Sequence, residues 1–248
     1  MGSRQKRHRR AREMTSMCTV TIMDNAELYR LMSWLSPAYP VGAFCYSHGL
    51  EWLVETGAIR DVTSLEKWLG DLLLLGSGRN DAILFAHAHG AALYGNTKAL
   101  CEVADYANAV ATSAERRLET NAQGKAFSDV TGKTWGSATL RQLSSLYSGP
   151  ISYPVAVGVT AADHGVTLTA ALAAYVHAFT ANLVSAGVRL IPLGHTDGQR
   201  VLMQLESVVA ETVARGLSGT LSQLSNVAIM AEIAAMKHET QYTRLFRS

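Results

Sequence analysis

The spacing of the apolar residues is the feature that most constrains what this chain can fold into. In stretch after stretch they recur every three or four positions, as they do along one face of an α-helix. Examples are Val62, Leu65, Trp68, Leu69, Leu72 and Leu73, and further on Leu202, Leu205, Val209 and Val213. Strand-like alternation is limited to one short stretch, TVTIM at residues 19–23. The pattern predicts an all-α, single-domain bundle of about eight to ten helices.

Several residues carry the signals of helix ends. Thr63 and Glu66 have the spacing of a capping box at the start of the helix near residue 62. Gly57 suits the end of the preceding helix. Thr196 or Asp197 can cap the helix that follows the loop IPLGHTDGQ.

One segment, residues 166–188, contains no charged residue. Its length is compatible with a membrane span, which would make this a transport protein. However, its apolar residues are mostly alanines and it also contains His177 and Asn182. These features favour a long central alanine-rich helix, buried on all sides, and no membrane.

The charge is distributed unevenly. Of the 22 basic residues in the 248-residue chain, six lie in the first twelve positions, so the rest of the chain carries 16 basic against 20 acidic residues. The mildly acidic body does not resemble a nucleic-acid-binding surface. We expect a basic, disordered extension at residues 1–24, followed by one all-α domain at residues 25–248.

The cysteines and histidines point to no metal site and no cofactor. Cys18, Cys45 and Cys101 are few and widely spaced, which indicates a reducing compartment such as the cytoplasm. His87 and His89 are two positions apart, so on a helix they could not share one ion. The chain contains no H-E-x-x-H motif.

Two short stretches resemble parts of enzyme motifs. Residues 45–49, CYSHG, are close to the G-x-S-x-G nucleophile elbow, but cysteine replaces the first glycine and no strand leads into the turn. A serine at the start of a helix is more often a cap. Residues 132–134, GKT, lack the earlier glycine of a phosphate-binding loop. An enzyme in which Ser47 or His48 is catalytic remains the alternative hypothesis.

The end of the chain is unusual. Chain ends are commonly polar and frayed, whereas the last eleven residues, HETQYTRLFRS, alternate aromatic and aliphatic side chains with arginines. Tyrosine and arginine are enriched in interface hot spots. The tail could therefore fold against a partner or pack on its own core, and composition does not decide between the two.

Both unusual stretches resemble one family. The stretch SPAYPVGAFCYSHGLE, residues 36–51, resembles the N-terminal signature of the UreF family of urease accessory proteins, close to S-P-x-x-P-x-G-x-F-x-Y-S-x-G-L-E. The tail resembles the ending of that family, and the resemblance extends from about residue 25 to residue 248. Cys45 stands where the family would have serine, and we expect it to be buried as a small hydrophobic residue.

The resemblance implies a non-enzymatic, cytoplasmic, usually homodimeric protein. Such a protein would bridge a UreD/UreH-type accessory protein and the GTPase UreG, and would modulate GTP-dependent nickel delivery to apo-urease. Whether nickel passes through the dimer stays open. The family pattern further implies that Pro40, Gly42 and Gly49 shape the turn.

The same resemblance assigns partner-binding residues at both ends of the chain. Tyr46, Ser47 and Glu51 would lie at or near the surface offered to the GTPase. In the tail, Tyr242, Arg244 and Phe246 would take part, with Arg244 becoming ordered when the UreD-type partner binds. The planar guanidinium of arginine suits such a contact.

Overall fold

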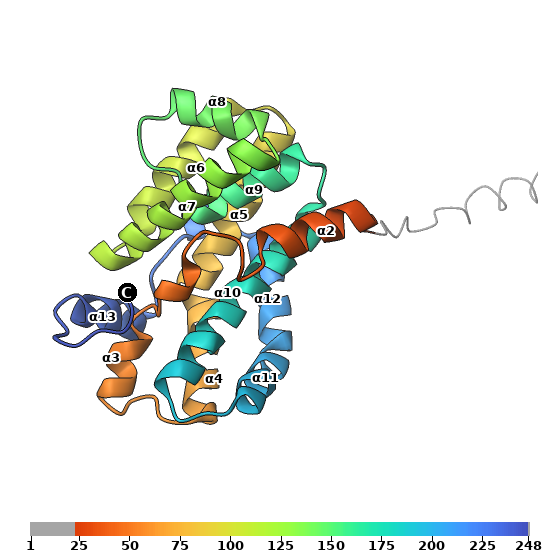
Figure 1. The fold of residues 1–248 in the computed structure, drawn as a ribbon. Helices are drawn as coiled ribbons and strands as arrows, with labels where there is room; N and C mark the ends of the chain where they lie inside the picture. Colours follow the sequence, from red (N-terminus) through yellow and green to blue (C-terminus); the bar gives the residue numbers. More distant parts are fainter. Residues whose placement is uncertain (1–22, 248) are drawn as a thin grey trace, which may run out of the picture.

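The computed structural model describes residues 23–247 of the chain, and these residues form helices without strands. The fold is therefore all-α, as the apolar spacing predicts. The strand considered at residues 19–23 and nearly all of the predicted basic extension lie outside the described residues. Figure 1 shows the arrangement of these helices. They are α2 (Asn25–Trp34), α3 (Leu50–Glu55), α4 (Val62–Leu75), α5 (Ser77–Leu93), α6 (Thr97–Val110), α7 (Ala114–Thr134), α8 (Ala138–Leu146), α9 (Tyr153–Asp163), α10 (Leu168–Leu190), α11 (His195–Gln204), α12 (Glu206–Ser218) and α13 (Ile229–His238), with short 3-10 helices η1 (Ala43–Cys45) and η2 (Leu221–Gln223).

Three abrupt breaks raise the number of helices in residues 23–247 above the expected eight to ten. Gly76 separates α4 from α5, and Leu205 separates α11 from α12. Gly165, whose φ of 71° is in the left-handed region, separates α9 from α10. Apolar periodicity continues across such breaks, so it cannot reveal them.

The most deeply buried helix is α9, not α10. From Pro154 to Ala162 every residue of α9 is buried. It packs closely on α5, and the absence of a side chain at Gly158 allows this approach. A Cβ atom there would lie 2.7 Å from the Phe85 carbonyl oxygen. The long alanine-rich helix α10 is present, but it is not buried on all sides as expected. Its inner face links two hydrophobic clusters, through Leu172 in one and Leu183 in the other.

The outer face of α10 lies beside α2 along an apolar groove of about 580 Å³. Among the helices described, α10 is long and apolar enough to cross a membrane by length and composition, and half of its most apolar stretch is buried inside the fold. A core helix passes the same test. Alanines line the α10 side of this groove, and their small side chains leave space beside α2.

The helix caps differ in part from those expected. Helix α4 is capped by Asp61, which accepts a hydrogen bond from the Ser64 amide at 2.8 Å, and not by Thr63 with Glu66. An aspartate immediately before the helix takes the cap position two residues earlier. Asp197 does act at the start of α11, where it accepts from the Gly194 amide at 3.2 Å. Gly57, with a φ of 73°, follows α3 as expected.

Two glycines in α7 provide a matched test of this packing. A side chain at Gly124 would collide with the backbone of Ile151 and Ser152, whereas one at Gly132 meets nothing within 4 Å. Gly124→Ala should lower the free energy of unfolding by about 3 kcal/mol, because backbone cannot easily yield. Gly132→Ala should raise it by about 0.5–1 kcal/mol through helix propensity. Urea unfolding followed by circular dichroism measures both, and equal effects would contradict the close α7 packing.

Candidate functional site

The conspicuous stretch at residues 36–51 forms turns that lead into α3. Pro40 lies in these turns, and Gly42 and Gly49 adopt φ values of 76° and 77°, which glycine accepts without strain. Gly49 also allows close approach, because a side chain there would lie 2.7 Å from backbone atoms of Ala234 and Ala235 in α13. The start of α3 is therefore pressed directly against α13, next to the C-terminus in Figure 1.

The side chains of Tyr46, Ser47 and Glu51 point inward and not toward the surface as expected. All three are buried, Ser47 completely. The positive φ values at His48 and Gly49 turn the chain so that this part of it packs under α13. Burial raises the pKa of Tyr46. Cys45, by contrast, is exposed and not buried as expected. The roles of these residues in partner binding stay predictions.

Glu51 joins the conspicuous stretch to the tail. Its carboxylate accepts hydrogen bonds from the backbone amides of Leu245 at 2.6 Å and Phe246 at 2.9 Å. It also lies 3.1 Å from Nε2 of His238, the last residue of α13. The next tail residue, Arg247, donates a hydrogen bond from its backbone amide to the Cys45 carbonyl at 2.8 Å. Hydrogen bonds thus join the stretch at residues 36–51 to the C-terminal tail.

Glu115 of α7 completes this junction. Its carboxylate lies 2.8 Å from Nδ1 of His238 and 3.1 Å from the guanidinium of Arg244. The His238 side chain is fully buried between the two glutamates. Burial alone would lower the pKa of His238, but the hydrogen bonds and charges of Glu115 and Glu51 outweigh it and raise the pKa. The imidazolium form is therefore stabilised.

The three predicted tail residues have different surroundings. Phe246 is buried, and the Arg189 guanidinium lies 4.4 Å from its ring centre and 3.5 Å from that of Phe44. Such a cation–π contact holds the tail against α10. Arg244 is partly exposed beside Glu115, and Tyr242 is fully exposed. In the chain by itself the tail packs on its own core, which is one of the two alternatives that composition left open.

A second buried cluster lies beside the first. His48 contacts Glu119 at 2.7 Å and Arg116 at 2.8 Å, and Arg116 also pairs with Glu119. Burial would raise the pKa of Glu119, but Arg116 and His48 lower it to about 2. Burial and the charge of Arg116 lower the pKa of His48. The cluster places an ionised carboxylate and a guanidinium inside the fold.

This geometry does not form a catalytic pair from Ser47 and His48. The Ser47 hydroxyl faces the Glu51 amide at 3.4 Å, while the His48 ring faces Glu119 and Arg116. A serine nucleophile needs a base within hydrogen-bond reach. The other motif, GKT at residues 132–134, lies in the last turn of α7 and forms no loop that could surround a phosphate.

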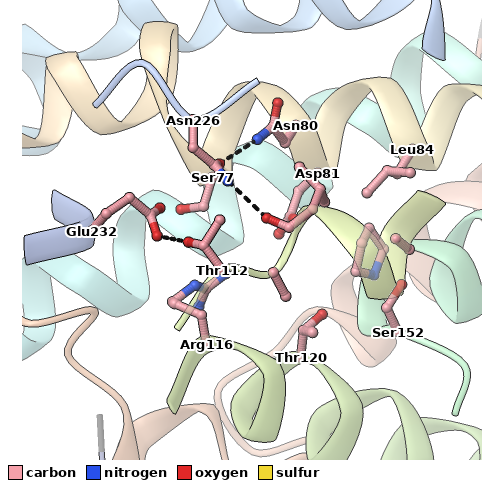
Figure 2. Close-up of a pocket in the computed structure, with 14 residues that line it drawn as sticks. Ser77, Asn80, Asp81, Leu84, Thr112, Arg116, Thr120, Ser152, Asn226 and Glu232 are labelled. Carbon is pink, nitrogen blue, oxygen red and sulfur yellow. Dashed lines mark hydrogen bonds between the residues drawn. The ribbon is translucent and has the colours of Figure 1, made fainter. Parts of the chain in front are cut away.

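A small polar pocket lies where α5, α7, α9 and α13 meet (Figure 2). Its cavity of about 30 Å³ is large enough for one or two water molecules. The hydroxyl groups of Ser77, Thr120 and Ser152 are buried there without hydrogen-bond partners in the described part of the chain. Asp81 accepts from the Tyr175 hydroxyl at 3.1 Å. Burial raises the pKa of Asp81 to about 6, against the opposing effect of Arg116.

Most of these groups could not be found from the sequence alone. They are charged or titratable side chains that the fold buries wholly or in part: Asp81, Glu115, Arg116, Glu119 and His238. The sequence offers one signal for this cluster, which is that Glu115 and Glu119 fall on the same face of α7. Which face of α7 points into the fold depends on the neighbouring helices, so the sequence alone does not show that these residues are buried. Across residues 23–247 no group of three or more His, Cys, Asp or Glu side chains is arranged to hold a metal ion.

Comparison with known proteins identifies the family. The UreF family model matches residues 59–206. A protein of Bradyrhizobium sp. strain BTAi1 named "Urease accessory protein UreF" is 50% identical over 229 residues, covering 92% of this chain and 95% of the relative. One of Rhodopseudomonas palustris strain BisB5 with the same name is 48% identical over 239 residues, covering 96% and 98%. The chain belongs to the UreF family.

The raised pKa of Asp81 leads to a pH-dependent prediction. The folded protein binds this proton more tightly than the unfolded chain, whose aspartates have a pKa of 3.8. The resulting stabilisation is complete below that value and is lost as the pH rises through about 6. Asp81→Asn stays neutral and can still accept from Tyr175. It should therefore exceed the wild type in unfolding free energy by about 3 kcal/mol at pH 8, and match it near pH 3.

Urea unfolding at several pH values measures this difference. The matched control is Asp105→Asn, since Asp105 is exposed and also accepts from a tyrosine hydroxyl, that of Tyr147 at 2.8 Å. The control should stay within about 0.5 kcal/mol of the wild type at each pH. A difference for Asp81→Asn that does not grow with pH would contradict the cost of ionising this buried carboxyl.

Proposed function

We propose that this protein is a non-enzymatic, cytoplasmic accessory factor in urease maturation. In this proposal it bridges a UreD/UreH-type accessory protein and the GTPase UreG, and modulates GTP-dependent nickel delivery to apo-urease. The relatives named as urease accessory proteins support the role in maturation. The observation that carries the bridging role is the junction at Glu51, which holds the tail on the body and creates a composite surface there.

The tail surface is suited to a protein partner. An open groove of about 660 Å³ lies between the start of α7 and the tail. Leu118 and Leu245 on this groove are exposed by 58% and 67%, and Arg244 and Arg247 are beside them. Exposed apolar side chains that lie together mark interaction sites, and arginine is enriched in interface hot spots. We assign this groove to the UreD-type partner.

Helix α13 adds a second exposed apolar strip next to the tail. Ile229, Ile233 and Met236 recur at helical spacing, and each is between 38% and 63% exposed. An unpaired apolar helix face of this kind is typical of interaction sites. Tyr46, Ser47 and Glu51 then act indirectly in partner binding, because their buried side chains support the tail and α13 and do not touch the partner.

Removal of one exposed tail arginine tests the bridging role. Arg244→Ala should weaken the ternary complex with the UreD-type protein and the GTPase about tenfold, as expected for an interface arginine. The fold should persist because the Arg244 side chain is 40% exposed. The measurement is co-purification of the three co-expressed proteins, quantified by titration of the GTPase.

Two further variants make this experiment specific to the tail. Arg141→Ala, an exposed arginine on α8, is the matched control and should leave the complex unchanged. A chain ending at Thr240 removes the tail but keeps His238, and should lose the complex. Undiminished co-purification of both Arg244→Ala and the shortened chain would remove the tail from the bridging role.

The groove between α2 and α10 supports the proposed homodimer. It is lined mainly by apolar side chains, and the adjacent Tyr29, Met32 and Phe44 are exposed by 60–67%. A two-fold interface pairs one surface with itself, so it needs projecting side chains and a recess on the same face. This face offers both, and we assign it to a second copy of the chain.

Two equally exposed methionines test the dimer. Met32 on α2 is 67% exposed and Met203 on α11 is 66% exposed. Met32→Arg should convert the dimer to a monomer at micromolar concentration, because two arginines would face an apolar recess. Met203→Arg should leave the dimer intact. Light scattering after size-exclusion chromatography gives the molar mass of each, and a dimeric Met32→Arg would argue against this face.

A further inference from the structure

The junction contains a histidine whose two ring nitrogens both face carboxylates. Nε2 of His238 lies 3.1 Å from Glu51 on α3, and Nδ1 lies 2.8 Å from Glu115 on α7. A neutral imidazole carries one N–H, so it can donate to only one of the two. The doubly protonated ring donates to both. With both glutamates ionised, the geometry therefore matches the imidazolium form.

The charges around His238 nearly balance while the ring is protonated. Facing it are Glu51 from α3 and Glu115 from α7, and Arg244 of the tail shares Glu115. Its neighbours in sequence, Lys237 and Glu239, are exposed, and Glu239 accepts from the Ala114 amide at 3.0 Å. Two carboxylates thus meet one guanidinium and one imidazolium. Loss of the ring proton would leave one buried negative charge in excess.

The excess charge would fall on Glu51. Glu115 keeps Arg244, and its shorter contact favours the proton that remains on Nδ1. Glu51 would then face an unprotonated nitrogen and retain only the amides of Leu245 and Phe246. A buried carboxylate without a charged partner is costly and is relieved by contact with water. The contacts that Leu245 and Phe246 make with this carboxylate are their backbone amides, so release of these amides would let water reach it.

We infer that His238 is a proton-operated latch for the tail. The protonated ring holds residues 244–247 against α3, and deprotonation releases them from Glu51. The tail surface is then presented in one ordered arrangement below a threshold pH and is freed above it. The latch belongs to the chain itself and operates without any partner, so it goes beyond the proposed function and does not depend on it.

The direction of the pH effect follows from the pKa of His238. Burial lowers this pKa, but Glu115 and Glu51 raise it above the ordinary histidine value of 6.5. A raised pKa in the folded state means that the stabilisation is complete below pH 6.5 and is lost as the pH rises through the higher value. The tail should therefore be docked at neutral pH and released in alkaline solution.

Amide hydrogen exchange of the full chain, read by mass spectrometry and corrected for intrinsic rates, tests the latch. Between pH 6.5 and 9.5 the protection of the tail amides at residues 244–247 should fall about tenfold, while that of the buried helix α9 should not change. In His238→Gln, which cannot titrate, tail protection should be low and independent of pH. His195→Gln, an exposed histidine at the start of α11, should behave like the wild type.

Two results would overturn the latch: wild-type tail protection constant within twofold over this range, or the same fall in His238→Gln. If His238→Gln does not fold, as judged by circular dichroism, Glu51→Gln takes its place. That variant removes one of the two carboxylates that favour the imidazolium, so the fall should move to lower pH. A fall that stays at the wild-type pH would also refute the inference. None of these measurements requires a partner.

Discussion

The arrangement of the C-terminal tail on α3 and α13 depends on one buried carboxylate. Glu51 receives two backbone amides of the tail and faces the His238 ring, so residues almost two hundred positions apart meet at one side chain. A buried charge is tolerated only when it is paired and hydrogen-bonded. The tail supplies the amides and α13 supplies the ring, and this requirement orders the segment that borders the proposed partner surface.

The same junction shows that the motif at residues 36–51 has a structural role. Within residues 36–51, the side chains of Tyr46, Ser47, His48 and Glu51 suggest a site offered to a substrate or partner. The structure turns all four side chains inward, because His48 and Gly49 take left-handed conformations and Gly49 allows α13 to approach. The motif shapes and holds a surface that other residues form.

Much of the fold could be predicted and much of the site could not. Helix content, the stop after α3 at Gly57 and the long alanine-rich helix follow from local preferences. The interior position of α9, the open groove beside α10 and the exposure of Cys45 do not. Alanine-rich helices look alike whether buried or at a groove, because burial depends on which neighbours cover them.

The sequence by itself determined the all-α class, the family and the two unusual stretches, residues 36–51 and the tail, since helical periodicity and motif residues can be recognised along the chain. Only the tertiary structure decided that these two stretches meet, that Glu51 and Glu115 share His238, and that Asp81 lines a polar pocket. The physical reason is distance along the chain. A helix is specified by contacts three or four residues apart, whereas the environment of a buried charge is set by elements far away in sequence.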